Sequence, residues 1–212
     1  IINSTIHTRG SAEGYLGKDL ERDLIQEVQL AAKDTGGEGM PFLQAVDLVR
    51  ANQPPGWNPE DPPTSPTAFP SDLYLLVDER LKEKLSEEVN RNPSLARALS
   101  GYAGGGRLAF CTAAGSQLDT RHKVDAFFEL DFFDRVGAQV PPARRVFSTI
   151  DVTQNPAKAE HDVKADVLAY LGGYMDASRE ERERMVQVIA DEIAENLIEK
   201  LKGQGVRRQL VS

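Results

Sequence analysis

Residues 119–154 constrain the fold of this chain more than any other stretch, because they hold two β-rich runs with a carboxylate inside each. The stretch reads DTRHKVDAFFELDFFDRVGAQVPPARRVFSTIDVTQ. An acidic side chain in a strand interior loses hydration, so it needs a basic group, another cation or a metal ion beside it. Asp125 and Asp151 occupy such positions and are therefore the first candidates for chemistry.

The rest of the chain combines amphipathic helices with these strands and predicts an α/β fold. β-branched and aromatic residues predict strands at 107–113, 122–133 and 144–153. Apolar residues at helical spacing predict helices at 16–33, 41–52, 72–91, 157–171 and 178–202. We therefore expect a small mixed central sheet of three to five strands, flanked by helices.

A proline-dense stretch at 53–72 separates two of the expected helices. It contains seven of the twelve prolines, and no regular element tolerates so many fixed φ angles and missing donors. Trp57 and Phe69 favour an ordered excursion loop that packs on the surface over a flexible linker. The chain is thus expected to form one domain, 1–212, with its sheet core and candidate active site at 107–171.

Charge and cysteine content narrow the class of protein. A net charge of −8 opposes non-specific binding to nucleic acid, although it leaves room for a local basic groove or a metal-bridged contact. The single cysteine, Cys111, rules out an internal disulfide and fits a reducing, cytoplasmic location. The sequence contains no run of about 18 apolar residues, so no membrane span is expected. The first residues lack a signal-peptide pattern, and because the chain starts at Ile1 a removed leader stays open.

Strand alternation predicts that the two aspartates share one face of the sheet. Lys123 and Asp125 fall on one face of the second strand, and Asp151 and Thr153 fall on one face of the third. If these strands pair, the two carboxylates lie side by side and repel each other. A divalent cation relieves that repulsion, and carboxylate oxygens suit Mg²⁺ or Mn²⁺.

The order of these elements resembles that of the PD-(D/E)XK nuclease superfamily, whose members have the restriction-endonuclease-like fold. Val124-Asp125 corresponds to the first half of the motif and Asp151-Val152-Thr153 to the second, with 25 residues between the aspartates. The resemblance extends from about residue 16 to residue 171. It implies an endonuclease in which Asp125 and Asp151 bind Mg²⁺ (or Mn²⁺), and the metal activates water to hydrolyse a DNA phosphodiester bond.

The resemblance also implies roles for residues outside the two aspartates. Glu21 or Glu27 of the first expected helix would be the accessory acid. Thr153 stands where the family has lysine, and a hydroxyl cannot supply a positive charge. Lys158 or Lys164 is the leading candidate for that charge, and Lys123 is a further one because of its position two residues before Asp125.

Several simpler interpretations stay open beside the nuclease. Asp125 could pair with Lys123, Arg144 or Arg145, and Asp151 could close a turn with Asn155. Cys111 fits a buried apolar residue better than a nucleophile, and the three histidines do not have metal-ligand spacing. The alternative function is a non-catalytic binding or assembly module with a degenerate nuclease-like fold. Its long last helix would be a partner-facing surface, which leaves a homodimer open.

Overall fold

A computed structural model describes residues 40–64, 68–91, 107–132, 144–155 and 164–209. Its elements, in chain order, are α2 (Phe42–Ala51), α3 (Phe69–Arg91), β1 (Arg107–Thr112), α5 (Gln117–His122), β2 (Ala126–Phe132), β3 (Arg144–Thr153), β4 (Val167–Tyr170) and α6 (Arg179–Gln209). The helix expected at 16–33 lies outside the described residues. Within these segments, no helix combines the length and apolar character that a membrane crossing requires.

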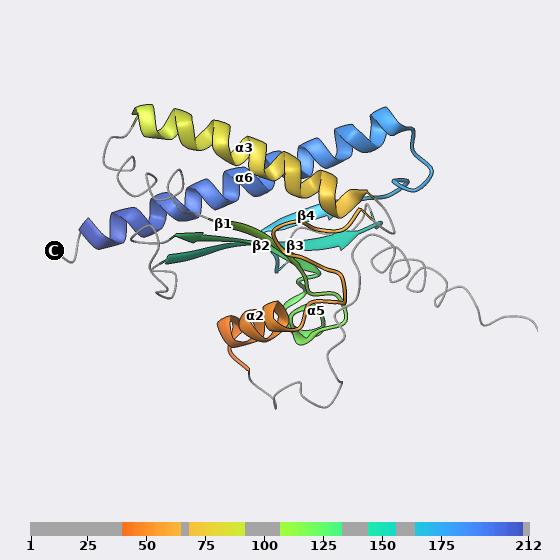
Figure 1. Cartoon of the computed structure of the whole chain (residues 1–212), viewed down its shortest axis with the longest axis horizontal. Helices are drawn as coiled ribbons and strands as arrows, with labels where there is room; N and C mark the ends of the chain where they lie inside the picture. The colour runs from red at the N-terminus through yellow and green to blue at the C-terminus, as the bar shows by residue number, and fades with distance from the viewer. Residues whose placement is uncertain (1–39, 65–67, 92–106, 133–143, 156–163, 210–212) are drawn as a thin grey trace, which may run out of the picture.

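The four strands form one mixed sheet in the order β1-β2-β3-β4. β2 is antiparallel to both β1 and β3, whereas β3 and β4 are parallel. Figure 1 shows α3 and α6 crossing one face of this sheet, with α2 and α5 on the other. The prediction of an α/β fold with a mixed sheet between helices is therefore confirmed.

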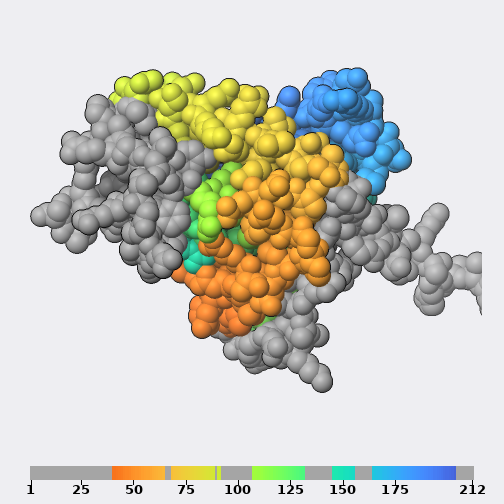
Figure 2. All heavy atoms as spheres, viewed as in Figure 1, coloured from red at the N-terminus to blue at the C-terminus, as the bar shows by residue number. Residues whose placement is uncertain are grey.

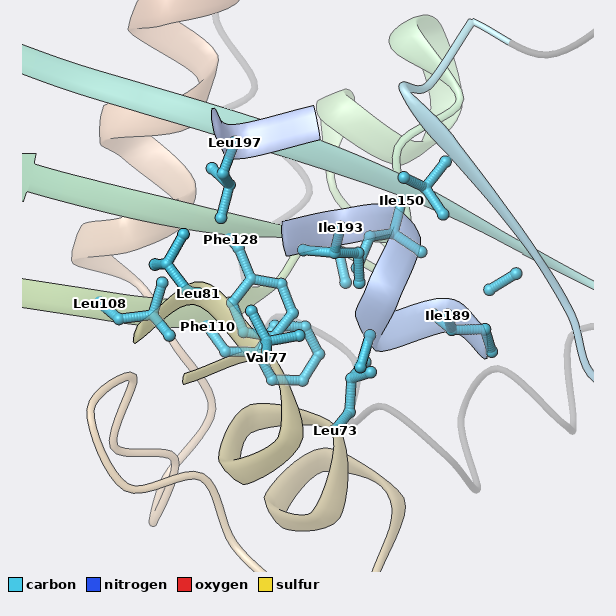
Figure 3. Packing of buried hydrophobic residues seen from close by; sticks show 14 of the residues in the cluster. Leu73, Val77, Leu81, Leu108, Phe110, Phe128, Ile150, Ile189, Ile193 and Leu197 are labelled. Atoms are coloured by element: carbon cyan, nitrogen blue, oxygen red, sulfur yellow. The ribbon is translucent and has the colours of Figure 1, made fainter. Parts of the chain in front are cut away.

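The larger core lies between the sheet and the α3–α6 layer. Alternation sends Phe110 of β1 and Phe128 of β2 to this face, where their rings stack at 4.5 Å with an interplanar angle of 11°. Figure 3 shows the helices that cover them, with Leu73, Val77 and Leu81 projecting from α3. α6 contributes Ile189, Ile193 and Leu197 to the same cluster.

A smaller core lies on the opposite face, beneath α2 and α5. Phe127 and Cys111 point from the sheet to this side and pack with Val46, Val49 and Leu118. The two faces of β2 therefore enter different cores, as strand alternation predicts for Phe127 and Phe128. Val124 also belongs to the smaller core, although alternation counted back from β2 assigned it to the other face. The reason is that Val124 precedes the strand.

The proline-rich segment closes one edge of the sheet. Phe110, on edge strand β1, donates its N–H to Pro59 O at 2.7 Å and accepts the Trp57 indole N–H at its carbonyl at 2.9 Å. The side-chain amide of Gln53 bonds both backbone groups of Thr112. Figure 2 shows residues 40–64, in orange, spread over the middle of the face in view. These residues form an ordered excursion whose bonds satisfy backbone groups that an edge strand leaves unpaired.

Two sequence-based boundaries around β2 and α3 are wrong. The strand expected at 122–133 starts at Ala126, because Ser116 caps the short helix α5 through a bond from the Leu118 N–H to its hydroxyl. Lys123 ends that helix with φ of 57°, so it does not share a strand face with Asp125. α3 begins at Phe69, before the expected caps Ser71 and Asp72.

The helix expected at 157–171 is also wrong where the structure describes it. Residues 167–170 form β4, whose Val167 is paired with Ile150 of β3 in the parallel register. The last helix starts as predicted, with Ser178 and Glu181 exchanging the reciprocal bonds of a capping box. It continues beyond the expected Lys202 to Gln209.

We expect Ile193→Ala to destabilise the protein by about 2–5 kcal/mol, because Ile193 is fully buried between α6 and the sheet and its loss leaves a cavity. Urea unfolding followed by circular dichroism measures the change. Val188→Ala, on the same helix at a position 60% exposed, is the matched control and should stay within about 0.5 kcal/mol of the parent. Equal effects of the two substitutions would contradict the packing of α6 described above.

Candidate functional site

The two aspartates singled out from the sequence lie at the same end of the β2–β3 hairpin. Asp125 was expected inside the second strand, but it directly precedes β2, whose first residue Ala126 pairs with Ile150. The backbone and side chain of Asp125 bond Ile150 and Val152, the two residues that flank Asp151 on β3. Each of the two aspartates is only 4% exposed. The hairpin therefore buries two carboxylates at neighbouring backbone positions, a placement that requires specific partners for negative charge.

Asp125 ties together three parts of the sheet. Its carboxylate accepts the N–H of Val152 at 2.7 Å, its own N–H donates to Ile150 O at 2.8 Å, and its carbonyl accepts the N–H of Ala113 at 2.7 Å. This aspartate thus has a structural role in joining β2 to β3. A carboxylate offers about four lone-pair sites on two oxygens, so it can bond a backbone N–H and a cation at the same time.

Thr153, at the position where the resembled family has lysine, closes the turn that follows β3. Its hydroxyl accepts the N–H of Asn155 at 3.1 Å. A threonine hydroxyl in such a turn can bond to water or to a ligand oxygen, but it carries no charge.

A pocket of about 570 Å³ opens on the face of the sheet that carries Thr149, two residues before Asp151. Its lining includes aromatic and charged side chains, among them Phe42, His122, Phe147, Lys164, Asp166 and Lys200. Lys164, one of the two lysines that the resemblance suggests as a positive group, is exposed at its rim. Because side chains alternate along a strand, Thr149 and Asp151 share a face, and the pocket lies on the side of the sheet toward which Asp151 projects.

Asp166 organises one wall of this pocket. One of its carboxylate oxygens accepts both the N–H and the hydroxyl of Thr149, at 2.8 and 2.7 Å, and its own N–H donates to that hydroxyl. The other oxygen contacts the Lys200 ammonium at 2.6 Å. Lys200 also donates to Phe147 O at 2.9 Å. The segment before β4, strand β3 and helix α6 are thereby joined around one carboxylate.

A buried ion network that the sequence analysis missed occupies the other end of the hairpin. Glu129 and Asp131 of β2 are 0% and 2% exposed. Arg50, in the last turn of α2, bonds Glu129 at 2.9 Å and Asp131 at 3.2 Å, and Arg145 of β3 forms a short contact with Glu129. Glu129 and Asp131 in FELDF, two residues apart, could have indicated two acids on one strand face. Nothing in the sequence around Arg50 indicates that it pairs with them.

Burial raises the pKa of Glu129, and the hydrogen bond from Arg145 opposes that rise. The neighbouring Asp131 raises the pKa further, both by its hydrogen bond and by its charge. Glu129 Oε2 and Asp131 Oδ1 are buried without another hydrogen-bond partner among the described residues. Burial and the neighbouring acid therefore favour the neutral, protonated form of Glu129, whereas the arginines favour its charged form.

The other predicted site residues have varied placements. Lys123 is exposed at the end of α5. Glu21, Glu27 and Lys158 lie outside the described residues. Cys111 is fully buried, and burial raises the pKa of its thiol to about 12, so it is a protonated core residue as predicted. Across the described segments, no group of three or more His, Cys, Asp or Glu side chains is arranged to hold a metal ion.

Comparisons with known proteins gave no match of any kind. No protein-family model matches the chain, and neither a curated protein nor a solved structure resembles it significantly.

Glu129 gives a prediction for the pH dependence of stability. Because its pKa in the folded protein lies above its usual value of 4.5, the folded state holds this proton more tightly than the unfolded chain. That contribution is fully present below about pH 4.5 and is lost as the pH rises through the raised pKa. We therefore expect the free energy of unfolding to fall with rising pH relative to Glu129→Gln, in urea titrations between pH 4 and pH 8.

The matched control for this measurement is Glu199→Gln, which removes an exposed carboxylate on α6. Its difference from the parent should not show the same fall with pH. A parent protein that gains stability relative to Glu129→Gln as the pH rises would show that the arginines outweigh burial.

Proposed function

We propose that this protein is a metal-dependent endonuclease of the restriction-endonuclease-like fold, which hydrolyses DNA phosphodiester bonds. The observation that carries the proposal is the placement of Asp125 and Asp151 at one end of adjacent antiparallel strands. Two buried carboxylates at neighbouring positions form a donor set that suits Mg²⁺, which binds through one or two carboxylates and keeps water ligands for a phosphate.

The order of the elements supports the same proposal. The aspartate of the first half-motif directly precedes β2, and the Asp-x-Thr triplet ends β3, so both halves reach the same end of the hairpin. β1 and β3 flank β2 in antiparallel pairing, and β4 then extends the sheet in parallel. Three consecutive strands with acids where the second begins and the third ends are compatible with the sequence resemblance, which also implies a helix where residues 167–170 form β4.

Each residue would contribute a distinct part of the reaction. Asp125 and Asp151 would hold Mg²⁺ or Mn²⁺, which when bound polarises the scissile phosphate and lowers the pKa of a coordinated water. The bond from the Val152 N–H fixes the Asp125 carboxylate relative to β3. Lys164 would supply positive charge toward the phosphate from the pocket rim. The Thr153 hydroxyl would act as a neutral hydrogen-bonding group.

The decisive experiment removes the charge of each aspartate while keeping its shape. We expect Asp125→Asn and Asp151→Asn each to lower Mg²⁺- or Mn²⁺-dependent cleavage of plasmid DNA by roughly 10²–10³-fold, because each variant loses a negatively charged metal ligand. Asparagine keeps a carbonyl oxygen that can accept the Val152 N–H, so Asp125→Asn preserves the structural bond.

Asp191→Asn is the matched control, because its carboxylate is half-exposed and pairs with Arg80 of α3 in the helical layer. It should cleave at the parental rate. Cleavage that persists unchanged in Asp125→Asn would show that these carboxylates do not form the catalytic centre.

A second candidate function is a non-catalytic binding or assembly module, and the structural bonding of Asp125 favours it. In that case Asp125 joins β2 to β3 through the Val152 N–H and has no metal to hold. Titration calorimetry with Mn²⁺ separates the two functions. A nuclease site binds Mn²⁺ and loses that binding in the Asp125→Asn, Asp151→Asn double variant, whereas a module gives no heat of binding in either protein.

A further inference from the structure

We infer that the pocket beside β3 binds a single nucleotide unit, with its phosphate between Lys164 and Lys200 and its base against the aromatic wall. The identity of this ligand rests on the proposed function, since a nuclease acts on a strand of nucleotides. The binding itself does not require the metal. The inference is drawn from the size, charge and wall chemistry of the pocket.

The charge of the pocket differs from that of the whole chain. The protein carries a net charge of −8, yet three cationic side chains line this pocket, those of Lys164, Lys200 and Arg145. Arg145 is paired with Asp47 and Glu129, and Lys200 is paired with Asp166, so the excess positive charge comes from Lys164. Within the described residues, Lys164 forms no ion pair, and its side chain is exposed. A locally positive hollow on an acidic protein favours an anionic ligand.

Lys200 is held in place to receive such a ligand. Its ammonium has three N–H donors, of which Asp166 takes one at 2.6 Å and the carbonyl of Phe147 takes another at 2.9 Å. Asp166 is itself anchored by the two bonds from Thr149. Among the described residues no partner takes the third donor, so a ligand oxygen can bind it at a fixed point, and little side-chain freedom is lost when a phosphate binds.

Part of the pocket lining is aromatic. The rings of Phe42 and His122 lie 5.6 Å apart, and those of Phe42 and Phe147 lie 6.5 Å apart, all in edge-to-face contact. Phe42 and Phe147 are only partly buried and both line the hollow, and the Arg145 guanidinium lies over the Phe147 ring at 5.0 Å. Aromatic side chains bind bases of any sequence through their π faces. A pocket that combines a cation with aromatic side chains suits a nucleotide better than inorganic phosphate, because only the nucleotide has a base to contact the rings.

The volume and position of the pocket agree with this ligand. About 570 Å³ is within the range of small-molecule sites and admits one nucleotide with its flanking backbone. The pocket includes Thr149, which lies two residues from Asp151 on the same face of β3. A nucleotide bound here would therefore be a neighbour of the one whose phosphate reaches the two aspartates.

The test measures binding without metal, so that it does not depend on cleavage. Fluorescence anisotropy with labelled oligothymidylate in EDTA reports strand binding, and calorimetry with thymidine 5′-monophosphate reports binding of the free nucleotide. We expect Lys164→Ala and Lys200→Gln each to weaken binding about tenfold, the effect of losing one charge-assisted hydrogen bond. Lys82→Ala, which removes an exposed lysine paired with Asp78 on α3, is the matched control and should leave both affinities unchanged.

Two further readouts identify what the pocket recognises. Loss of one phosphate contact should reduce the slope of log K against log salt by about 0.7 for the single strand in Lys164→Ala. Deoxyribose 5-phosphate, which lacks the base, should bind about fivefold or more weakly than thymidine 5′-monophosphate. If the two substitutions weaken the affinity for the oligonucleotide alone, the pocket binds a nucleic-acid strand. If they also weaken the affinity for thymidine 5′-monophosphate, the pocket binds free nucleotides as well.

The inference is wrong if neither lysine substitution weakens nucleotide binding. It is also wrong if deoxyribose 5-phosphate binds as tightly as thymidine 5′-monophosphate. Because Lys164 is exposed, its variant keeps the test valid even where Lys200→Gln lowers stability. If cleavage depends on metal but binding does not depend on the lysines, nucleotide binding in the pocket is excluded and the proposed nuclease function stands. If binding depends on the lysines but no metal-dependent cleavage occurs, the nuclease function is excluded and nucleotide binding in the pocket stands.

Discussion

Burial of negative charge is the constraint on which the rest of this structure depends. The carboxylates of Asp125, Glu129, Asp131 and Asp151 are all buried in or beside the β2–β3 hairpin. Each must meet a donor or a cation, or take up a proton. At one end of the hairpin, arginines from α2 and β3 meet this need, so neutralising charge also fastens α2 to the sheet. At the other end a backbone N–H of β3 bonds Asp125, and our proposal adds a divalent cation there.

Local chemistry was enough to predict several elements from the sequence. The third strand, 144–153, was placed to the residue because its β-branched and aromatic run is followed by Asn155-Pro156, which cannot continue a ladder. The start of α6 was predicted because Ser178 and Glu181 satisfy each other's backbone N–H groups within four residues. The sequence analysis expected Asp125 and Asp151 side by side because it placed both inside pairing strands, although Asp125 in fact directly precedes β2.

The parts that sequence reasoning missed depend on contacts between distant residues. An apolar run of four residues, 167–170, suits a helix or a strand equally well, and only its pairing with β3 decides for β4. α5 is too short to show a helical period. The ion pair between Arg50 and Glu129 joins residues 79 apart, and nothing near either position predicts it. The Asp166–Lys200 pair likewise joins residues that are distant in sequence, and it lies beside the pairing of β4 with β3.

The proline-rich loop has a consequence for how the sheet can be altered or extended. In the sequence it looks like an insertion between two helices, which protein engineers would remove to make a smaller domain. In the structure its Pro59, Trp57 and Gln53 occupy the backbone groups through which Phe110 and Thr112 of β1 would otherwise accept another strand. Deleting the loop would therefore leave β1 as an unpaired edge strand, through which molecules could aggregate by strand addition. A segment that looks dispensable thus keeps this sheet at a finite width.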